Sequence, residues 1–221
     1  MDKLSVVIIT FNEESNIGRC IDSVLPVADE ILVYDSFSTD NTQAVCSTYP
    51  TVKFIQHGFD GFSPQKNRAN EAAVYPFILS IDADEALSET LIHSILNVKE
   101  KAEADAYECN RLTNYLGKLI YHGGWYPDRK LRLFRKSKGK WVGDIHESLV
   151  MDSGSTMGFL KGDLLHYSYT SIEGHVAQFD KFTTLSAIQL NNEGKKAGYL
   201  KIMLSPLASF IKGFFLRLGF L

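Results

Sequence analysis

Residues 77–84 read FILSIDAD, an apolar run that ends in two aspartates separated by one alanine. A short apolar run of this kind predicts a strand that is buried on both faces of a parallel sheet. Side chains two apart in an extended chain point the same way, so Asp82 and Asp84 are expected to converge on one ligand. Two carboxylates held together repel each other unless a cation or a proton lies between them. The pair therefore predicts a site for Mg²⁺ or Mn²⁺ that is shared with phosphate oxygens.

This run is the last of four that alternate with helical patterns. We expect strands at 4–10, 30–34, 52–56 and 77–81, and helices at 13–24, about 38–49, 63–74 (capped by Ser63) and 88–102. This order predicts an α/β fold with a central, mostly parallel sheet and helices on both faces. Ligands bind such sheets outside the carboxyl ends of the strands. The position therefore favours ligand binding over the alternative, a solvated turn in which Asp84 and Glu85 cap the next helix.

The second half of the chain has a different pattern. Residues 105–167 hold short β-like stretches with Gly and Asp at the turns, and 169–192 read as a helix that Gly174 weakens. We therefore expect one α/β domain with a mixed β extension at 105–170, followed by C-terminal helices at 171–221.

Composition narrows the class of protein. The chain has 221 residues, 45% hydrophobic and 22% charged, which is enough for one domain with a sizeable core. A net charge of -3 shows no basic excess, so no nucleic-acid partner is expected. Cys20, Cys46 and Cys109 lack paired spacing and are expected to be reduced thiols in a cytosolic protein. We find no signal peptide and no uninterrupted apolar stretch of the roughly 18 residues that a membrane span needs.

Four segments in this order resemble the motifs of inverting family-2 glycosyltransferases, which have the GT-A fold. They are 4–14 (LSVVIITFNEE), 31–42 (ILVYDSFSTDNT), 63–67 (SPQKN) and 77–84. Together they span residues 4–85, and four motifs in the right order are more specific than any one of them. The resemblance implies a nucleotide-sugar-binding half at 1–104 and an acceptor-side half at 105–170.

The resemblance also implies roles for single residues. The donor-binding residues would be Thr10, Asn12, Glu13, Asp35, Lys66 and Asp82, and the metal ligand would be Asp84. Asp35 would accept a hydrogen bond from the base, and Lys66 would offset phosphate charge. Each has a structural alternative: loop hydrogen bonding for Thr10 and Asn12, a helix cap for Asp35, and a solvated helix face for Lys66.

Residues 143–147 (GDIHE) resemble a motif of one subgroup, the lipopolysaccharide-core β-glucosyltransferases, as does 125–135 (WYPDRKLRLFR). An inverting transfer needs a base that takes the proton of the acceptor hydroxyl. Glu147 is the candidate and Asp144 and His146 are its rivals; alternatively, Glu147 pairs with an arginine of the basic strand.

Arg129, Arg132 and Arg135 alternate with apolar residues in that basic strand. We expect them on one face, where they would hold an acidic acceptor or the donor's phosphates. A solvated β face is the alternative. The scattered histidines, including His166 and His175, are interpreted as structural or surface residues, and Trp125 as a sugar-stacking or a core residue.

Residues 199–221 form a basic, aromatic, amphipathic helix pattern that Pro206 and Gly213 interrupt. Such a helix can lie in a membrane interface; packing on the catalytic domain or on a second subunit is the alternative. The subgroup usually continues past a stretch like 219–221 (GFL), so we expect a truncation there.

The sequence therefore predicts a metal-dependent enzyme that transfers a hexose, by subgroup resemblance glucose, from a UDP-sugar to a glycan or glycolipid acceptor such as lipopolysaccharide core. It would be cytoplasmic, peripheral on the inner face of the membrane. Two alternatives stay open. A nucleotidyltransferase of similar fold would usually carry a glycine-rich loop after its first strand, which residues 10–14 lack. A non-catalytic nucleotide-sugar-binding module would have no need of Asp82, Asp84 and Glu147.

Overall fold

The computed structural model describes residues 2–143 and 147–221. The predicted strands and helices of the first half all form, and a short strand, β5, appears in addition. The elements are β1 (Leu4–Thr10), α1 (Ile17–Val24), β2 (Glu30–Asp35), α2 (Thr42–Ser47), β3 (Val52–Gln56), α3 (Phe62–Ala72), β4 (Phe77–Asp82), β5 (Glu85–Leu87) and α4 (Glu89–Glu100).

The second half contains a longer strand than its broken pattern predicts. Its elements are β6 (Ala106–Tyr115), β7 (Lys118–Leu119), β8 (Asp128–Arg135), a 3₁₀ turn (Lys136–Lys138), β9 (Gly139–Val142), β10 (Ser148–Met151), β11 (Met157–Tyr169), α5 (Ile172–Asn192), α6 (Tyr199–Ile211) and a π-helical turn (Lys212–Leu216). Gly162 lies inside β11 with φ +96°, where a side chain would overlap the backbone of Leu91. Because glycine tolerates this geometry, the strand continues past α4 where a turn was expected.

The main sheet has the strand order β3-β2-β1-β4-β8-β6-β11-β5, with β7 on β6. The strands β3, β2, β1 and β4 are parallel, and β8 runs antiparallel to β4. The chain order reverses between β1 and β4, which is where ligands bind in such sheets. The register pairs Thr10 with Asp35 and Ile9 with Asp82. The predicted site residues at these three strand ends therefore meet at one edge of the sheet.

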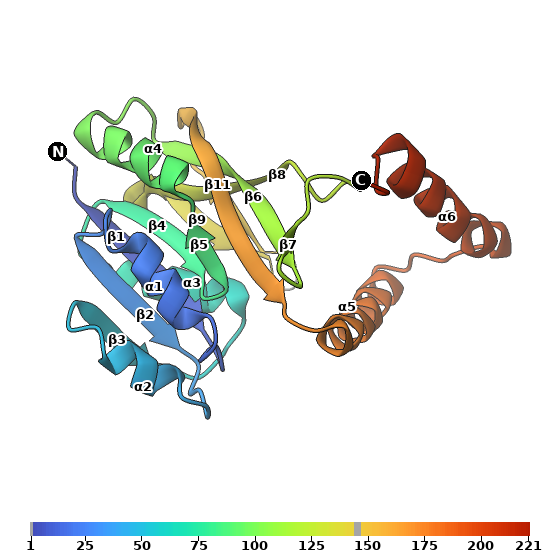
Figure 1. The fold of residues 1–221 in the computed structure, drawn as a ribbon, viewed down its shortest axis with the longest axis horizontal. Coiled ribbons are helices and arrows are strands. Elements are labelled where there is room, and N and C mark those ends of the chain that lie inside the picture. Colours follow the sequence, from blue (N-terminus) through green and yellow to red (C-terminus); the bar gives the residue numbers. More distant parts are fainter. Residues whose placement is uncertain (1, 144–146) are drawn as a thin grey trace. The chain divides into compact units, whose positions relative to one another are not determined.

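Two buried clusters of side chains cover the two faces of this sheet. Its strands β2, β1 and β4 lie side by side in Figure 1. Val6 and Ile8 face α1 and α4, whereas Val7 between them faces α3. This alternation follows from the period of two in a strand, and it explains why the whole run is apolar. The three cysteines are free and buried, as predicted.

The arginines of β8 do not share one face, so that prediction is wrong. Arg132 is buried at 5% exposure, whereas Arg129 pairs with Glu108 and Arg135 pairs with Asp105. Residues three apart in a strand point to opposite faces because the side-chain period is two. Of these three arginines, Arg132 is the one that pairs with Asp82 and Glu85.

The contacts between residues divide the chain into two compact units, 1–111 with 128–166 and 112–127 with 167–221. In the second unit, the rings of Tyr115, Trp125, Tyr169 and His175 pack together, and Tyr115 bonds His175 through its hydroxyl at 2.9 Å. Neither α5 nor α6 contains a buried residue. By length and composition alone, the described residues include one helical segment apolar enough to cross a membrane, Tyr199–Leu216, with a mean hydropathy of 1.3.

Candidate functional site

Asp82, the last residue of β4, lies between two buried cations. Its Oδ1 is 2.9 Å from Lys66 Nζ, and its Oδ2 is 3.0 Å from Arg132 Nη2. Burial alone would raise the pKa of Asp82, but the charges of Lys66 and Arg132 hold that pKa well below its usual range. Asp82 is therefore ionised at neutral pH, and its carboxylate is already oriented at the edge of the sheet.

Lys66 joins this carboxylate to the predicted base. It is only 1% exposed, and its Nζ also lies 2.9 Å from Glu147 Oε1 and 4.4 Å from the centre of the Trp141 ring. It is thus no solvated helix residue, and Glu147 pairs with a lysine where the alternative foresaw an arginine. The sequence-distant carboxylates Asp82 and Glu147 meet through one ammonium group.

Helix α3 holds the segment that carries Glu147. Its Asn67 side chain bonds both backbone groups of Trp141, at 2.9 Å to the nitrogen and 2.8 Å to the oxygen. Ser63 was expected to cap this helix, but the helix begins one residue earlier, and Ser63 Oγ donates to the carbonyl of Gly143. These bonds hold residues 141–143 against α3, with the ring of Trp141 over the ammonium group of Lys66. The rivals Asp144 and His146 lie outside the described residues.

Arg132 and Glu85 form a second buried pair that sequence reasoning missed. Arg132 Nη2 lies 2.7 Å from Glu85 Oε1, and Glu85 also accepts the backbone N–H of Asp82 at 3.0 Å. Burial opposes the charge of Arg132, but Glu85 and Asp82 outweigh it and raise the pKa of Arg132 above its usual range. Glu85 directly follows the Asp-Ala-Asp triplet, so its position was the available signal.

Asp84 lies beside His166, which had been interpreted as structural or surface. The distance between Asp84 Oδ2 and His166 Nε2 is 3.2 Å. Glu13 lies nearby: burial raises its pKa, and the charges of Asp84, Asp40 and Asp82 add to that rise. Negative charge therefore accumulates on this side of the site. Asp82 contacts Lys66 and Arg132, whereas Asp84 contacts His166, so their convergence on one ligand stays a prediction.

The described side chains around Asp84 suit a metal ion that is bound partly by the protein and partly by a substrate, and they are too few for a site made of protein ligands alone. Within residues 2–143 and 147–221, no three His, Cys, Asp or Glu side chains are grouped so as to hold an ion. Asp84 and His166 offer one carboxylate and one imidazole. Mg²⁺ is commonly bound by one or two carboxylates together with substrate phosphates, and imidazole also suits transition metals. The residues present therefore fit a divalent ion whose other ligands come from a diphosphate.

The loops after β1 and β2 are organised by their own polar side chains. Asp35 is fully buried and accepts bonds from the backbone and hydroxyl of Ser38 and, at 3.0 Å, from Gln56. Asn12 has φ 56° and accepts the backbone N–H of Thr39 at 2.8 Å. Thr10 is buried, and its hydroxyl has no partner among the described residues. These loops are therefore shaped in advance, and the Thr10 hydroxyl still has a hydrogen bond to give.

Three comparisons place the chain among known proteins. The model of the family "Glycosyl transferase family 2" matches residues 5–159. An uncharacterized glycosyltransferase of Rickettsia typhi is 32% identical, over 98% of this chain and 78% of the relative. The lipopolysaccharide core biosynthesis glycosyltransferase LpsC of Rhizobium meliloti is 30% identical, over 96% of this chain and 80% of the relative.

The structure is also similar to a mannosyltransferase from Pyrobaculum calidifontis that was solved with GDP-Man and Mn²⁺. The TM-score is 0.54 at 16% sequence identity, over 75% of this chain and 56% of that one. At this identity the similarity concerns the fold alone, and it confirms the predicted α/β architecture of the GT-A type.

Proposed function

Because this chain belongs to glycosyltransferase family 2 and is a transferase, we propose that it moves glucose from a UDP-sugar to a glycan acceptor such as lipopolysaccharide core, with inversion at the anomeric carbon. One observation carries the proposal: Lys66 binds Asp82 and Glu147 at the same distance, 2.9 Å. A donor-side carboxylate and a base candidate thus lie on either side of one buried charge. The 30% identity with LpsC supports the choice of acceptor.

The strand ends form the donor site in this proposal. The Thr10 hydroxyl and the loops of Asn12 and Asp35 bind the nucleoside, with Asp35 acting chiefly by holding Ser38 in place. Asp82 is kept ionised and accepts hydrogen bonds from hydroxyl groups of the ribose. Lys66 and Arg132 lie behind it and balance its charge, so the site can take a diphosphate beside a carboxylate.

Asp84 and His166 would hold a divalent ion together with the two phosphates. When bound, such an ion stabilises the charge that develops on the leaving diphosphate. Glu13 supports this arrangement, because the carboxylates of Asp84, Asp40 and Asp82 add to the rise in its pKa that burial causes. A cation at Asp84 would offset the part of that rise that comes from the neighbouring carboxylates.

Glu147 would act on the acceptor. Its carboxylate takes the proton of the attacking hydroxyl, while the acceptor oxygen bonds to the anomeric carbon and the bond to the diphosphate breaks. A single displacement of this kind needs only one base and inverts the configuration. Lys66 orients Glu147 through the 2.9 Å contact between its Nζ and Glu147 Oε1.

The C-terminal helices would keep the enzyme on the inner face of the cytoplasmic membrane, where a glycolipid acceptor lies. Lys201 lies in the first turn of α6 and Lys212 directly follows its end, and the helix has no buried residue. Basic residues beside exposed apolar ones are typical of helices that lie in the membrane interface.

Hydrolysis of a panel of nucleotide sugars tests the proposal. UDP-glucose, UDP-GlcNAc and GDP-mannose would each be incubated with the full chain, with Mn²⁺ or with EDTA, and release of the diphosphate measured. We expect release from UDP-glucose with Mn²⁺ alone, and faster release when a lipopolysaccharide-core acceptor is added. Preference for GDP-mannose would refute the donor, and equal rates in EDTA would refute the metal.

A further inference from the structure

The second unit contains a cavity of about 380 Å³ that plays no part in the proposed transfer. It lies between the loop after β7 and the end of the C-terminal helix. Its lining includes Tyr121, His122, Tyr126, Pro127, Arg217 and Leu218. A volume of this order accommodates a small polar headgroup, and the lining combines aromatic rings with one strong cation.

The backbone fixes the C-terminal turn against this loop. The N–H of Gly123 donates to the carbonyl of Arg217 at 2.8 Å. Gly124 has φ +89°, and a methyl group built on it would lie 2.1 Å from the guanidinium of Arg217. A larger residue at this position would be strained by the positive φ and would displace the guanidinium, so glycine keeps Arg217 close to the loop.

Arg217 forms no ion pair with any of the described residues, 2–143 and 147–221. Its guanidinium carries five N–H donors. Tyr121 and Tyr126 stand edge to face beside it, with ring centres 5.6 Å apart, and His122 completes the polar lining. A guanidinium presents a fork that matches the oxygens of a phosphate group, and tyrosine and histidine add single donors. The chemistry of the cavity therefore suits a phosphate.

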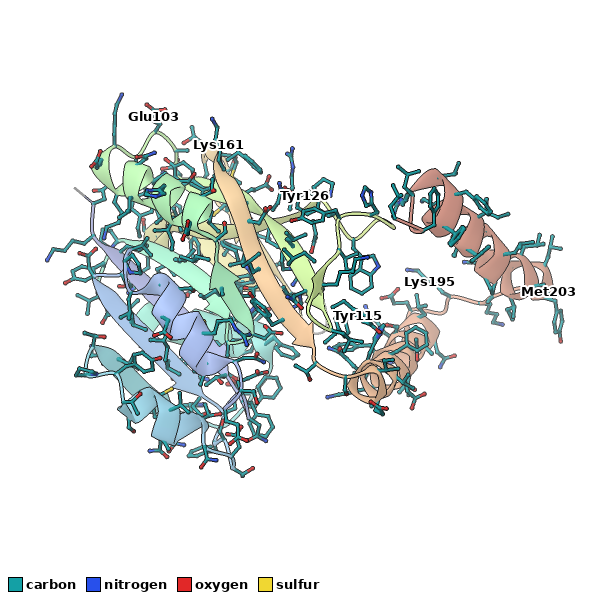
Figure 2. All side chains as sticks on the ribbon, viewed as in Figure 1. Glu103, Tyr115, Tyr126, Lys161, Lys195 and Met203 are labelled. Carbon is teal, nitrogen blue, oxygen red and sulfur yellow. The ribbon has the colours of Figure 1, made fainter. Side chains whose placement is uncertain are left out.

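The surroundings of the cavity are apolar and basic. Residues 194–221 contain five lysines and arginines and no aspartate or glutamate. Apolar side chains of α6 and the following turn are exposed, among them Leu200, Met203, Leu207, Phe210, Phe215 and Leu216; Met203, labelled in Figure 2, is 77% exposed. A free anion would contact only the basic residues of this surface. An anionic lipid would contact the basic residues through its headgroup and the apolar residues through its acyl chains.

We propose that the cavity around Arg217 binds the phosphate headgroup of an anionic membrane lipid, with α6 lying in the membrane interface beside it. Arg217 and His122 would contact the phosphate, and the loop 121–127 would be drawn to the membrane surface. This inference rests on the membrane contact in the proposed function and assigns a defined headgroup site to it.

Two charge-matched variants separate a headgroup site from general attraction. Arg217→Gln and Lys212→Gln each remove one positive charge from the same segment, but only Arg217 lines the cavity. Binding of the full chain would be measured by co-sedimentation with vesicles of phosphatidylcholine, with and without a fifth of phosphatidylglycerol. We expect Lys212→Gln to weaken binding to the anionic vesicles about fivefold, as one surface charge should. Arg217→Gln should weaken it by at least several times more, with no difference on neutral vesicles.

Arg217→Lys provides a second test because it keeps the charge and loses the fork. The proposal predicts that this variant recovers only part of the lost affinity, whereas Lys212→Arg behaves as wild type. Equal losses in the two glutamine variants, or full recovery in Arg217→Lys, would overturn the headgroup site.

Inorganic phosphate distinguishes the lipid from a free ion. Titrated by calorimetry without vesicles, it should bind the full chain only weakly. Tight binding that Arg217→Gln abolishes would make the free ion the ligand and overturn the lipid assignment. UDP binding with Mn²⁺, measured on the same variants, should match wild type. If UDP fails to bind wild type, the proposed function fails whatever the vesicles show; if only the vesicle contrast fails, the proposed function stands.

Discussion

At the scale of single residues, Glu13 carries the clearest sign of an unfavourable charge. Burial raises its pKa, and the carboxylates of Asp84, Asp40 and Asp82 raise it further. A carboxylate whose folded-state pKa lies above its unfolded value is destabilising at a pH where it is ionised, and the penalty fades as pH falls through the raised pKa.

We therefore predict that Glu13→Gln raises the melting temperature of the metal-free protein near pH 7. The difference from wild type should shrink as pH falls through the raised pKa of Glu13, and it should vanish below the ordinary glutamate pKa of about 4.3. Thermal melts across this range measure it, and Glu14→Gln, on the exposed neighbour, serves as the control. A lower melting temperature in Glu13→Gln at neutral pH would contradict this account of the charge cluster.

Glu147→Gln should lower turnover by about 10²–10⁴, the usual contribution of a general base, and leave UDP affinity nearly unchanged. The change keeps the size of the side chain and its oxygen toward Lys66. Steady-state transfer to a lipopolysaccharide-core acceptor measures turnover, and Glu103→Gln is the control because Glu103 forms an exposed ion pair with Lys101. Near wild-type turnover would transfer the role to Asp144, whereas a collapse of UDP binding would place Glu147 among the donor-binding residues.

The sequence predicted the residues at strand ends and missed their partners. Asp82 and Asp84 follow an apolar run directly, so a local pattern marks them. His166 reaches Asp84 and Arg132 reaches Glu85 only through the pairing of distant strands, which no local pattern contains. The roles of Asp35 and Lys66 remain predictions, although the structure buries both side chains among polar partners.

At the scale of elements, α3 joins the two sides of the site through one buried lysine. Removing a charge from a buried ion pair leaves its partner uncompensated, at a cost of roughly 3–5 kcal/mol. Because Asp82 and Glu147 keep side-chain exposures of 28% and 20%, the lower end of that range applies.

We predict that Lys66→Met destabilises the chain by about 3 kcal/mol in urea unfolding. Lys53→Met, which removes the 60% exposed partner of Glu30, should cost less than about 1 kcal/mol. Adding Glu147→Gln to Lys66→Met should restore part of the loss, since one of the two unpaired carboxylates disappears. Equal losses for the two lysines would show that the buried cluster adds no stability.

Strands and helices were predictable where the spacing of apolar residues followed which faces of the element are buried. Apolar runs marked the parallel strands β1, β2 and β4, because both faces of those strands are covered. The edge strand β3 has a weaker pattern, with Lys53 and Gln56 exposed. The long strand β11 was not predictable, because a glycine in a polar stretch usually indicates a turn. In the structure, Gly162 instead lets the backbone of α4 at Leu91 pack closely against the strand. The arginines of β8 were wrongly assigned to one face. They are three residues apart, and side chains three apart in a strand point to opposite faces.

At the scale of the whole molecule, the C-terminal segment should determine where the enzyme lies. A chain that ends at Asn192 loses no buried side chain, because α6 contains none, so its fold should survive. We predict that the shortened chain keeps its UDP affinity and no longer sediments with anionic vesicles. Each basic residue removed is worth about 1 kcal/mol near such a surface. Equal sedimentation of the two chains would favour packing of this segment against protein.

In the proposed mechanism, Asp84 and a divalent cation bind the diphosphate of the donor together. Calorimetric titration of UDP into wild type and Asp84→Ala, each with Mn²⁺ and with EDTA, measures this joint binding. We expect measurable affinity only for wild type with Mn²⁺, and a clear loss in the other three combinations while thermal melts show that Asp84→Ala remains folded. The same affinity in all four combinations would contradict it.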